Sequence, residues 1–449
     1  MNQLQLFLPC AAGVETLLAT EVQRITGISG KAWRAGVQLQ ASWRDALQLN
    51  LQSRLAQRVL IELQHGQYRN EQDLYNAAAS VAWEVWFTPN QTFKVEITAQ
   101  HSPLQSLNFA TLKVKDAIAD RFRHKFNDVR PSIDTRWPDV RVYVHLTTDT
   151  VTIYIDTSGE PLFKRGWRAD KGDAPLKETL AAAMLAASGW QADQPLYDPC
   201  CGSGTIVIEA AQIACHIAPG INRKFAFQKY LPFQNHVWEG LLDQAEAAIT
   251  EPSAPVFGSD VSFRMVDFAE RNAERAGVAH VVQLRGGDAL QRMPPAPSGV
   301  MLVNPPYGER IDVAGVAGIS GLQSRNQRDE RGQNVDDFGQ PLQRADAAYD
   351  TPRDRSANPG REQAHDAWGE ETSDFFAQLA THWKKNYAGW TAHVLTPDLK
   401  LPGKMRLKES RRVPLWNGPI ECRLFRFDMV SGSARGKPAA PTAPAAPTA

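Results

Sequence analysis

Residues 196–205 decide the fold, and they read Leu-Tyr-Asp-Pro-Cys-Cys-Gly-Ser-Gly-Thr. An apolar run ends at Asp198 and another apolar run follows the glycines, so the stretch predicts a strand, a tight turn and a helix. Gly202 and Gly204 lack a Cβ where a ligand would approach the backbone amides, and the helix N-terminus favours a carboxylate or phosphate. The turn indicates a nucleotide-like ligand, although alone it is equally compatible with an ordinary strand-to-helix connection.

What this turn lacks narrows the choice of ligand. Val207 stands where Gly-x-Gly-x-x-Gly requires its third glycine, and no Gly-Lys-Ser/Thr follows, which disfavours dinucleotides and nucleoside triphosphates. S-adenosylmethionine instead needs a glycine turn beside its amino-acid part and a carboxylate at the end of the next strand for its ribose hydroxyls. Asp260 can supply that carboxylate, and Asp288, after a third strand, is placed to bind the adenine amine.

A second motif occupies residues 304–310, Asn-Pro-Pro-Tyr-Gly-Glu-Arg, directly after an apolar strand. It therefore lies at a carboxyl end, where α/β sheets bind ligands. An aromatic amine can donate one hydrogen bond to the Asn304 side-chain oxygen and one to the Pro305 carbonyl, which aims its lone pair at an electrophilic methyl group. Tyr307 would stack on a base extracted from its helix. Alone, this motif is equally compatible with a proline-rich turn.

The remaining pattern predicts two kinds of architecture along the chain. After residue 160, strands alternate with helices, which is typical of a parallel doubly wound sheet; strands are expected at 195–198, 256–260, 281–285, 300–303 and 391–395. Before residue 160, an α+β pattern predicts a strand at 31–41 and helices at 43–55, 74–86 and 109–126. We expect domains at 1–65, 66–158 and 159–430, a disordered insertion at 313–366 and a disordered tail at 431–449.

Composition and charge restrict the class of protein. The 449 residues are 43% hydrophobic and 22% charged, as in soluble enzymes, and contain neither a bilayer-spanning stretch nor a signal peptide, so a cytoplasmic location is expected. The five cysteines lack metal-ligand spacing, so no metal is expected. The net charge is zero, but residues 400–437 contain ten Lys and Arg against three acidic residues, which fits either a polyanionic partner or a solvated surface.

Together, and in this order, the two motifs resemble those of class I S-adenosylmethionine-dependent methyltransferases that act on exocyclic amines. Residues 108–118 and 136–140 resemble a THUMP RNA-binding domain, and residues 156–168, 174–180 and 417–422 resemble bacterial large-subunit rRNA guanine-N2 methyltransferases. The resemblance covers residues 1–312 and 371–428. The chain is expected to stop before the second methyltransferase domain that is fused in some members of this family.

This resemblance implies a Rossmann-like class I methyltransferase domain preceded by an α+β ferredoxin-like/THUMP region. The implied activity is methyl transfer from S-adenosylmethionine to guanine N2 in RNA, with 23S rRNA or an assembling ribosomal particle as partner. The implied catalytic residues are Asn304, Pro305, Pro306 and Tyr307; the cofactor residues are Asp198, Cys201, Gly202, Gly204, Thr205, Asp260 and Asp288; and the RNA-binding residues are Lys113, Lys115, Arg123 and Arg310. Two alternatives stay open: N6-adenine methylation of DNA, and a non-catalytic RNA-binding factor of ribosome assembly.

Overall fold

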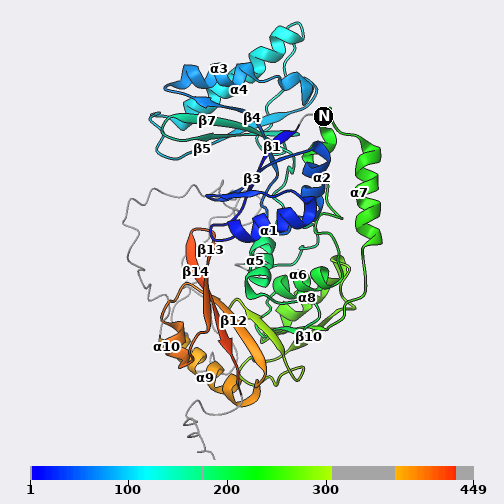
Figure 1. Ribbon diagram of the computed structural model, residues 1–449, viewed down its shortest axis with the longest axis vertical. Coiled ribbons are helices and arrows are strands. Elements are labelled where there is room, and N and C mark those ends of the chain that lie inside the picture. Colours follow the sequence, from blue (N-terminus) through cyan, green and yellow to red (C-terminus); the bar gives the residue numbers. More distant parts are fainter. Residues whose placement is uncertain (1–2, 173–174, 306–369, 431–449) are drawn as a thin grey trace, which may run out of the picture.

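The computed structural model describes residues 3–172, 175–305 and 370–430, and in these residues the chain builds two seven-stranded sheets (Figure 1). The expected insertion at 313–366 and tail at 431–449 lie outside the described residues. The N-terminal half contains β1 (Leu4–Pro9), α1 (Glu15–Thr26), β2 (Lys31–Trp33), β3 (Gly36–Ala41), α2 (Trp43–Gln52), β4 (Leu60–Gln67), α3 (Glu71–Ser80), the 3-10 helix η1 (Trp83–Val85), β5 (Phe93–Ala99), α4 (Leu107–Lys125), β6 (Val140–Leu146) and β7 (Thr150–Asp156).

The first sheet is continuous through the whole N-terminal half, in the order β2-β3-β1-β4-β7-β6-β5. Strand β4 pairs antiparallel with β1 on one side and with β7 on the other. The boundary expected at residue 65 therefore falls inside a strand and does not separate two sheets. Because β4 is hydrogen-bonded on both sides, the sheet has no unpaired strand edge at this position.

The described residues of the second half form the other seven strands and six α-helices. They are α5 (Glu178–Ser188), β8 (Leu196–Asp198), α6 (Thr205–Ala214), the 3-10 helix η2 (Ala226–Lys229), α7 (Asn235–Ala247), β9 (Val256–Asp260), α8 (Phe263–Arg275), β10 (Val282–Gly286), β11 (Gly299–Val303), α9 (Glu370–Asn386), β12 (Trp390–Thr396), α10 (Leu401–Met405), β13 (Arg411–Asn417) and β14 (Ile420–Asp428).

The second sheet has the order β10-β9-β8-β11-β12-β14-β13. Neighbouring strands from β10 to β12 are parallel, while β14 runs antiparallel between β12 and β13. The chain order reverses between β8 and β11, which is the switch point where such sheets bind ligands. The expected Rossmann-like domain behind an α+β region is thus confirmed, whereas the β13–β14 hairpin was not anticipated.

A buried ion cluster joins the two halves. Glu209, on α6, is fully buried; its carboxylate accepts from Arg54 Nη1 at 3.1 Å and from Arg165 Nε at 3.0 Å. Arg54 follows α2 of the N-terminal half, and Arg165 lies in the connection between the sheets and donates to the Arg54 carbonyl at 2.7 Å. Because one hydrophobic core also continues across this junction, α6 is fixed to the N-terminal half. No helix among the described residues has the length and apolar character needed to cross a membrane.

Candidate active site

Four neighbouring strands bring the predicted polar residues to one edge of the second sheet. Asp198 ends β8, Asp260 ends β9, Asp288 follows β10 and Asn304 follows β11. These strands are adjacent and parallel in the order β10-β9-β8-β11, so their carboxyl ends lie together around the switch point. The sheet topology thus assembles residues that are far apart in the sequence.

The two glycines of the turn after β8 serve different purposes. Gly202 has φ +53°, and an added Cβ there would meet no atom of the described residues within 4 Å other than its chain neighbours, so the described structure leaves space for a ligand beside it. Gly204 has φ +88°, and an added Cβ would lie 3.0 Å from the Ala269 Cβ and 3.1 Å from the Ile208 Cδ1. Gly202 therefore borders the ligand space, while Gly204 allows α6 to pack closely on α8.

Asp260 supports the glycine turn with both carboxylate oxygens. One oxygen accepts from the Gly202 amide at 2.9 Å and the other from the Ser262 amide at 2.9 Å. Burial raises the pKa of Asp260, against the effect of these two hydrogen bonds. The long sequence between Asp198 and Asp260 forms α6, η2 and α7, and it does not displace β9 from its place beside β8.

Asp198 is buried beneath the turn and accepts a hydrogen bond from the Cys200 amide at 3.0 Å. Burial raises its pKa to about 8, and the charge of Asp260 adds to the shift. Burial, followed by repulsion from Asp198, also raises the thiol pKa values of Cys200 and Cys201 well above the usual range. These two cysteines are therefore protonated at neutral pH and unsuited to act as nucleophiles.

The raised pKa of Asp198 predicts a pH-dependent stability. An unfolded aspartate titrates near pH ~4, whereas Asp198 in the folded protein titrates at about 8. Between these values the folded state holds the extra proton, so the contribution of Asp198 to the stability of the wild type falls as pH rises, and this loss levels off above pH 8. We expect Asp198→Asn to melt at higher temperature than wild type, by a margin that grows from acid pH towards pH 8. Circular dichroism melts of the ligand-free protein test this; a margin independent of pH would contradict it.

Asn304 presents a buried acceptor at the end of β11. Its side-chain oxygen is buried and has no hydrogen-bond partner among the described residues. A buried polar atom without a partner costs about 1–3 kcal/mol, so a donor from a bound ligand would be favoured there. Pro305 beside it is buried, while Pro306, Tyr307 and Arg310 lie outside the described residues.

Thr205 begins α6, and its hydroxyl accepts from Arg168 Nη2 at 2.7 Å. Arg168 also donates to Glu178 at 2.8 Å, so it ties the start of α6 to the start of α5. The hydroxyl of Thr205 is therefore engaged by the protein itself. Arg168 is a positioning residue that the sequence alone did not reveal, because its two partners follow 10 and 37 positions later.

Of the residues predicted to bind RNA, Lys113, Lys115 and Arg123 lie on α4, in the upper half of Figure 1, whereas α8 and β10 lie in its lower half. Lys113 Nζ lies 5.5 Å from the centroid of the Phe109 ring. Lys115 pairs with Asp116 at 3.0 Å, and Arg123 pairs with Asp120 at 3.0 Å. The structure therefore separates these cations from the sheet edge that carries Asn304. Within the described residues, no three His, Cys, Asp or Glu side chains are arranged to hold a metal ion.

The sheet order and the site at its switch point define a Rossmann-fold methyltransferase domain, here attached to an α+β N-terminal half. Family models match in the same order: the RlmL ferredoxin-like domain at residues 5–60, the THUMP domain at 68–156 and the RMKL-like methyltransferase domain at 165–318. The chain thus contains a THUMP domain and an RMKL-like methyltransferase domain, and the expected resemblance is confirmed.

Known proteins share this organisation. The ribosomal RNA large subunit methyltransferase K/L of Shewanella pealeana (strain ATCC 700345 / ANG-SQ1) is 34% identical over 93% of this chain and 52% of its own length. The chain spans about half the length of the curated relatives it matches. Among solved structures, SMU.472, a putative methyltransferase complexed with SAH, is 25% identical with a TM-score of 0.77 over 96% of this chain and 100% of its own. A predicted N6-adenine-specific DNA methylase from Listeria monocytogenes str. 4b F2365 is 25% identical with a TM-score of 0.75 over 95% and 96%.

Proposed function

We propose that this protein transfers a methyl group from S-adenosylmethionine to the exocyclic N2 amine of a guanine in RNA, and that the RNA is large-subunit rRNA in the cytoplasm. The observation that carries the proposal is the buried, unpaired Asn304 oxygen at the switch-point edge, beside a glycine turn and three carboxylates. An acceptor in this position suits an amine donor that must be aligned before it reacts.

The residues at this edge fit the cofactor. The open space beside Gly202 and the N-terminus of α6 suit the amino-acid part, Asp260 suits the ribose hydroxyls and Asp288 suits the adenine amine. S-adenosylmethionine supplies a methyl group that its sulfonium already activates. The protein therefore has to orient the base: the Asn304 oxygen and the Pro305 carbonyl each accept one hydrogen bond from the amine, and Tyr307 stacks on the ring.

RNA is favoured as the substrate by the THUMP domain and by relatives named as ribosomal RNA large subunit methyltransferases. Lys113, Lys115 and Arg123 of α4 would contact its phosphates, and Arg310, which follows the Asn-Pro-Pro-Tyr motif in the sequence, would contribute a fourth cation. N6-adenine methylation of DNA is the second candidate, because an adenine amine can make the same two hydrogen bonds and one solved relative carries that title. The THUMP domain in the N-terminal half favours RNA over DNA as the substrate.

A methyl-transfer assay separates these candidates. The purified chain would be incubated with radiolabelled S-adenosylmethionine and either a large-subunit rRNA transcript or duplex DNA, and the digested product would be identified by mass spectrometry. We expect N2-methylguanosine from RNA and no label in DNA. N6-methyladenine in DNA would support the second candidate, and binding of RNA without transfer would support a non-catalytic assembly factor. The absence of one methyl mark from the rRNA of a deletion strain would identify the nucleotide.

The glycine turn gives a prediction that depends on binding alone. We expect Gly202→Val to weaken S-adenosylmethionine binding strongly while leaving the protein folded, because its side chain would enter the ligand space and strain a turn at φ +53°. Gly204→Val is the matched comparison: its side chain would meet Ala269 and Ile208, so it should also destabilise the fold by about 1–3 kcal/mol. Titration calorimetry and thermal melts distinguish the two variants. If folded Gly202→Val binds S-adenosylmethionine with unchanged affinity, the cofactor does not bind at this turn.

A further inference from the structure

The basic run noted in the sequence leads to a surface that the proposed function does not use. Residues 404–412 contain five Lys or Arg and one acidic residue, Glu409. They form the end of α10, a short connection and the start of β13. Arg406, Lys408 and Arg411 are exposed, and none of these three side chains has an acidic partner among the described residues.

The strand pairing and a contact with α9 place this segment beside the amino half of the second sheet. Arg411 is opposite Arg426 on β14, and Arg426 is opposite His393, the fourth of the seven residues of β12. Lys384, close to the end of α9, donates to the Arg406 carbonyl at 2.8 Å, and α9 ends just before β12 begins. His393 is opposite Leu302 on β11, two residues before Asn304, so Arg411 is offset from Asn304 by about 7 Å along the strands and by three strand spacings across the sheet. These cations therefore lie across the sheet from Asn304.

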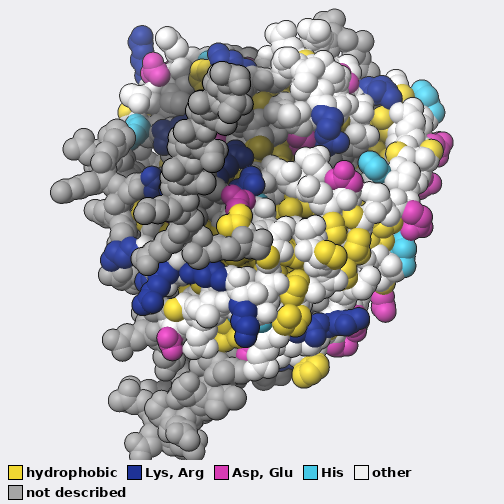
Figure 2. All heavy atoms as spheres, turned by 60° about the horizontal axis from the view of Figure 1, so that its bottom comes forward, with side chains coloured by type: hydrophobic (Ala, Val, Ile, Leu, Met, Phe, Trp, Pro, Cys, Tyr) yellow, Lys and Arg dark blue, Asp and Glu magenta, His cyan; other side chains and the backbone are white. Residues whose placement is uncertain are grey.

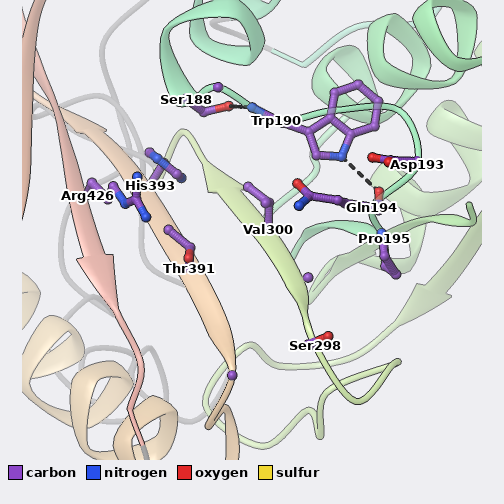
Figure 3. Close-up of a pocket in the computed structure, with 13 residues that line it drawn as sticks. Ser188, Trp190, Asp193, Gln194, Pro195, Ser298, Val300, Thr391, His393 and Arg426 are labelled. Atoms are coloured by element: carbon purple, nitrogen blue, oxygen red, sulfur yellow. Dashed lines mark hydrogen bonds between the residues drawn. The ribbon is translucent and has the colours of Figure 1, made fainter.

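A pocket of about 450 Å³ opens at the same edge, between the end of α5 and strands β11, β12 and β14 (Figure 3). Thr391, His393 and Arg426 line one side of it. The His393 Nδ1 is buried and has no hydrogen-bond partner among the described residues. Burial, with the charge of Arg426, lowers the pKa of His393 to about 4, so its ring is neutral and offers one donor and one acceptor.

Charge and polarity indicate what this surface binds. Lys and Arg side chains gather at the lower left of Figure 2, on the side where Figure 1 places α10 and β14. The exposed Arg406, Lys408 and Arg411 are five positions apart at most, within about 18 Å of chain. Apart from Trp190, Pro195 and Val300, the pocket is lined by polar residues and glycines, unlike the apolar surface that a stable protein interface buries. Clustered cations beside a polar hollow are typical of phosphate-backbone contacts.

We propose that Arg406, Lys408 and Arg411 form a second RNA contact, which we call the amino-edge patch; it lies beside Arg426, whose guanidinium is paired with Asp428 at 2.9 Å. It rests on the proposed function and extends it: the substrate RNA is held at α4, at the target base and at this patch. Arg411 is separated from Asn304 by three strand spacings of about 4.8 Å and by about 7 Å along the strands, so one folded RNA can reach both. The patch adds affinity without touching the base that reacts.

The test compares two triple variants of the full chain. Arg406→Gln/Lys408→Gln/Arg411→Gln removes the patch charges, and Arg24→Gln/Arg44→Gln/Lys224→Gln removes three exposed charges elsewhere. Filter binding of a large-subunit rRNA transcript is measured over a range of salt concentrations. We expect the patch variant to bind about tenfold or more weakly, with a log–log salt slope smaller by about three, and the control variant to bind like wild type. Transfer at saturating RNA and the affinity for S-adenosylmethionine should be unchanged in both.

Distinct outcomes identify which idea fails. If wild type methylates the transcript and the patch variant keeps its affinity and salt slope, the patch is not an RNA contact. If both triple variants weaken binding equally, net charge alone is responsible and the patch is again refuted. If sedimentation shows a wild-type dimer that the patch variant dissociates, the surface is a self-contact. If wild type transfers no methyl group to any RNA, the proposed function itself fails, whatever the binding data show.

Discussion

Asn304→Ala should lower the rate of methyl transfer by roughly 10²-fold or more, a plausible size for losing one preorganised polar contact. The Asn304 oxygen is buried and unpaired among the described residues, so its expected role is to accept a hydrogen bond from the target amine. That contact matters most when the base is aligned for transfer. Affinities for RNA and for S-adenosylmethionine should therefore stay close to those of wild type, and single-turnover methylation at saturating RNA measures the effect.

Two comparison variants make this result specific. Asn304→Asp keeps an acceptor oxygen and should retain more activity than Asn304→Ala. Lys113→Ala/Lys115→Ala/Arg123→Ala should instead weaken RNA binding and flatten its salt dependence, because fewer counterions are released. If Asn304→Ala methylates at the wild-type rate, the catalytic role of this motif is wrong.

Glu209→Ala should reduce the free energy of unfolding by about 3–5 kcal/mol, because it leaves Arg54 and Arg165 charged and buried without their acceptor. Glu160→Ala is the control: its ion pair with Lys164 is exposed and should contribute less than about 1 kcal/mol. Urea unfolding followed by circular dichroism measures both. Equal losses in the two variants would mean that the cluster does not hold the halves together.

The strands of the second sheet were predictable because a parallel, buried strand reads as an apolar run bounded by glycines and polar residues. Strand 256–260 is observed as expected, and the others shift by a residue at one or both ends. The expected strand 31–41 is instead the hairpin of β2 and β3, since Ala35 adopts φ +62° and reverses the chain. The expected helix 74–86 ends at Ser80, and η1 follows. The spacing of apolar residues along the sequence did not indicate the chain reversal at Ala35 or the end of the helix at Ser80.

The site was predictable in part for a topological reason. Asp198, Asp260, Asp288 and Asn304 all follow strands, and parallel strands bring such positions together. The cluster of Arg54, Arg165 and Glu209 was not predictable, because Glu209 lies 155 positions from Arg54 and reads as an ordinary residue of an apolar helix. Contacts of this range depend on how the two halves dock, which no local pattern encodes.

The fixation of α6 by Arg54 and Arg165 has a consequence for how a target is chosen. The helix that begins at the glycine turn is tied by two buried ion pairs to the N-terminal half, which also carries α4. If RNA binds α4 as proposed, this tie would limit which nucleotide of the bound RNA can reach Asn304. Selection would depend on the three-dimensional shape of the RNA more than on the bases that flank the target.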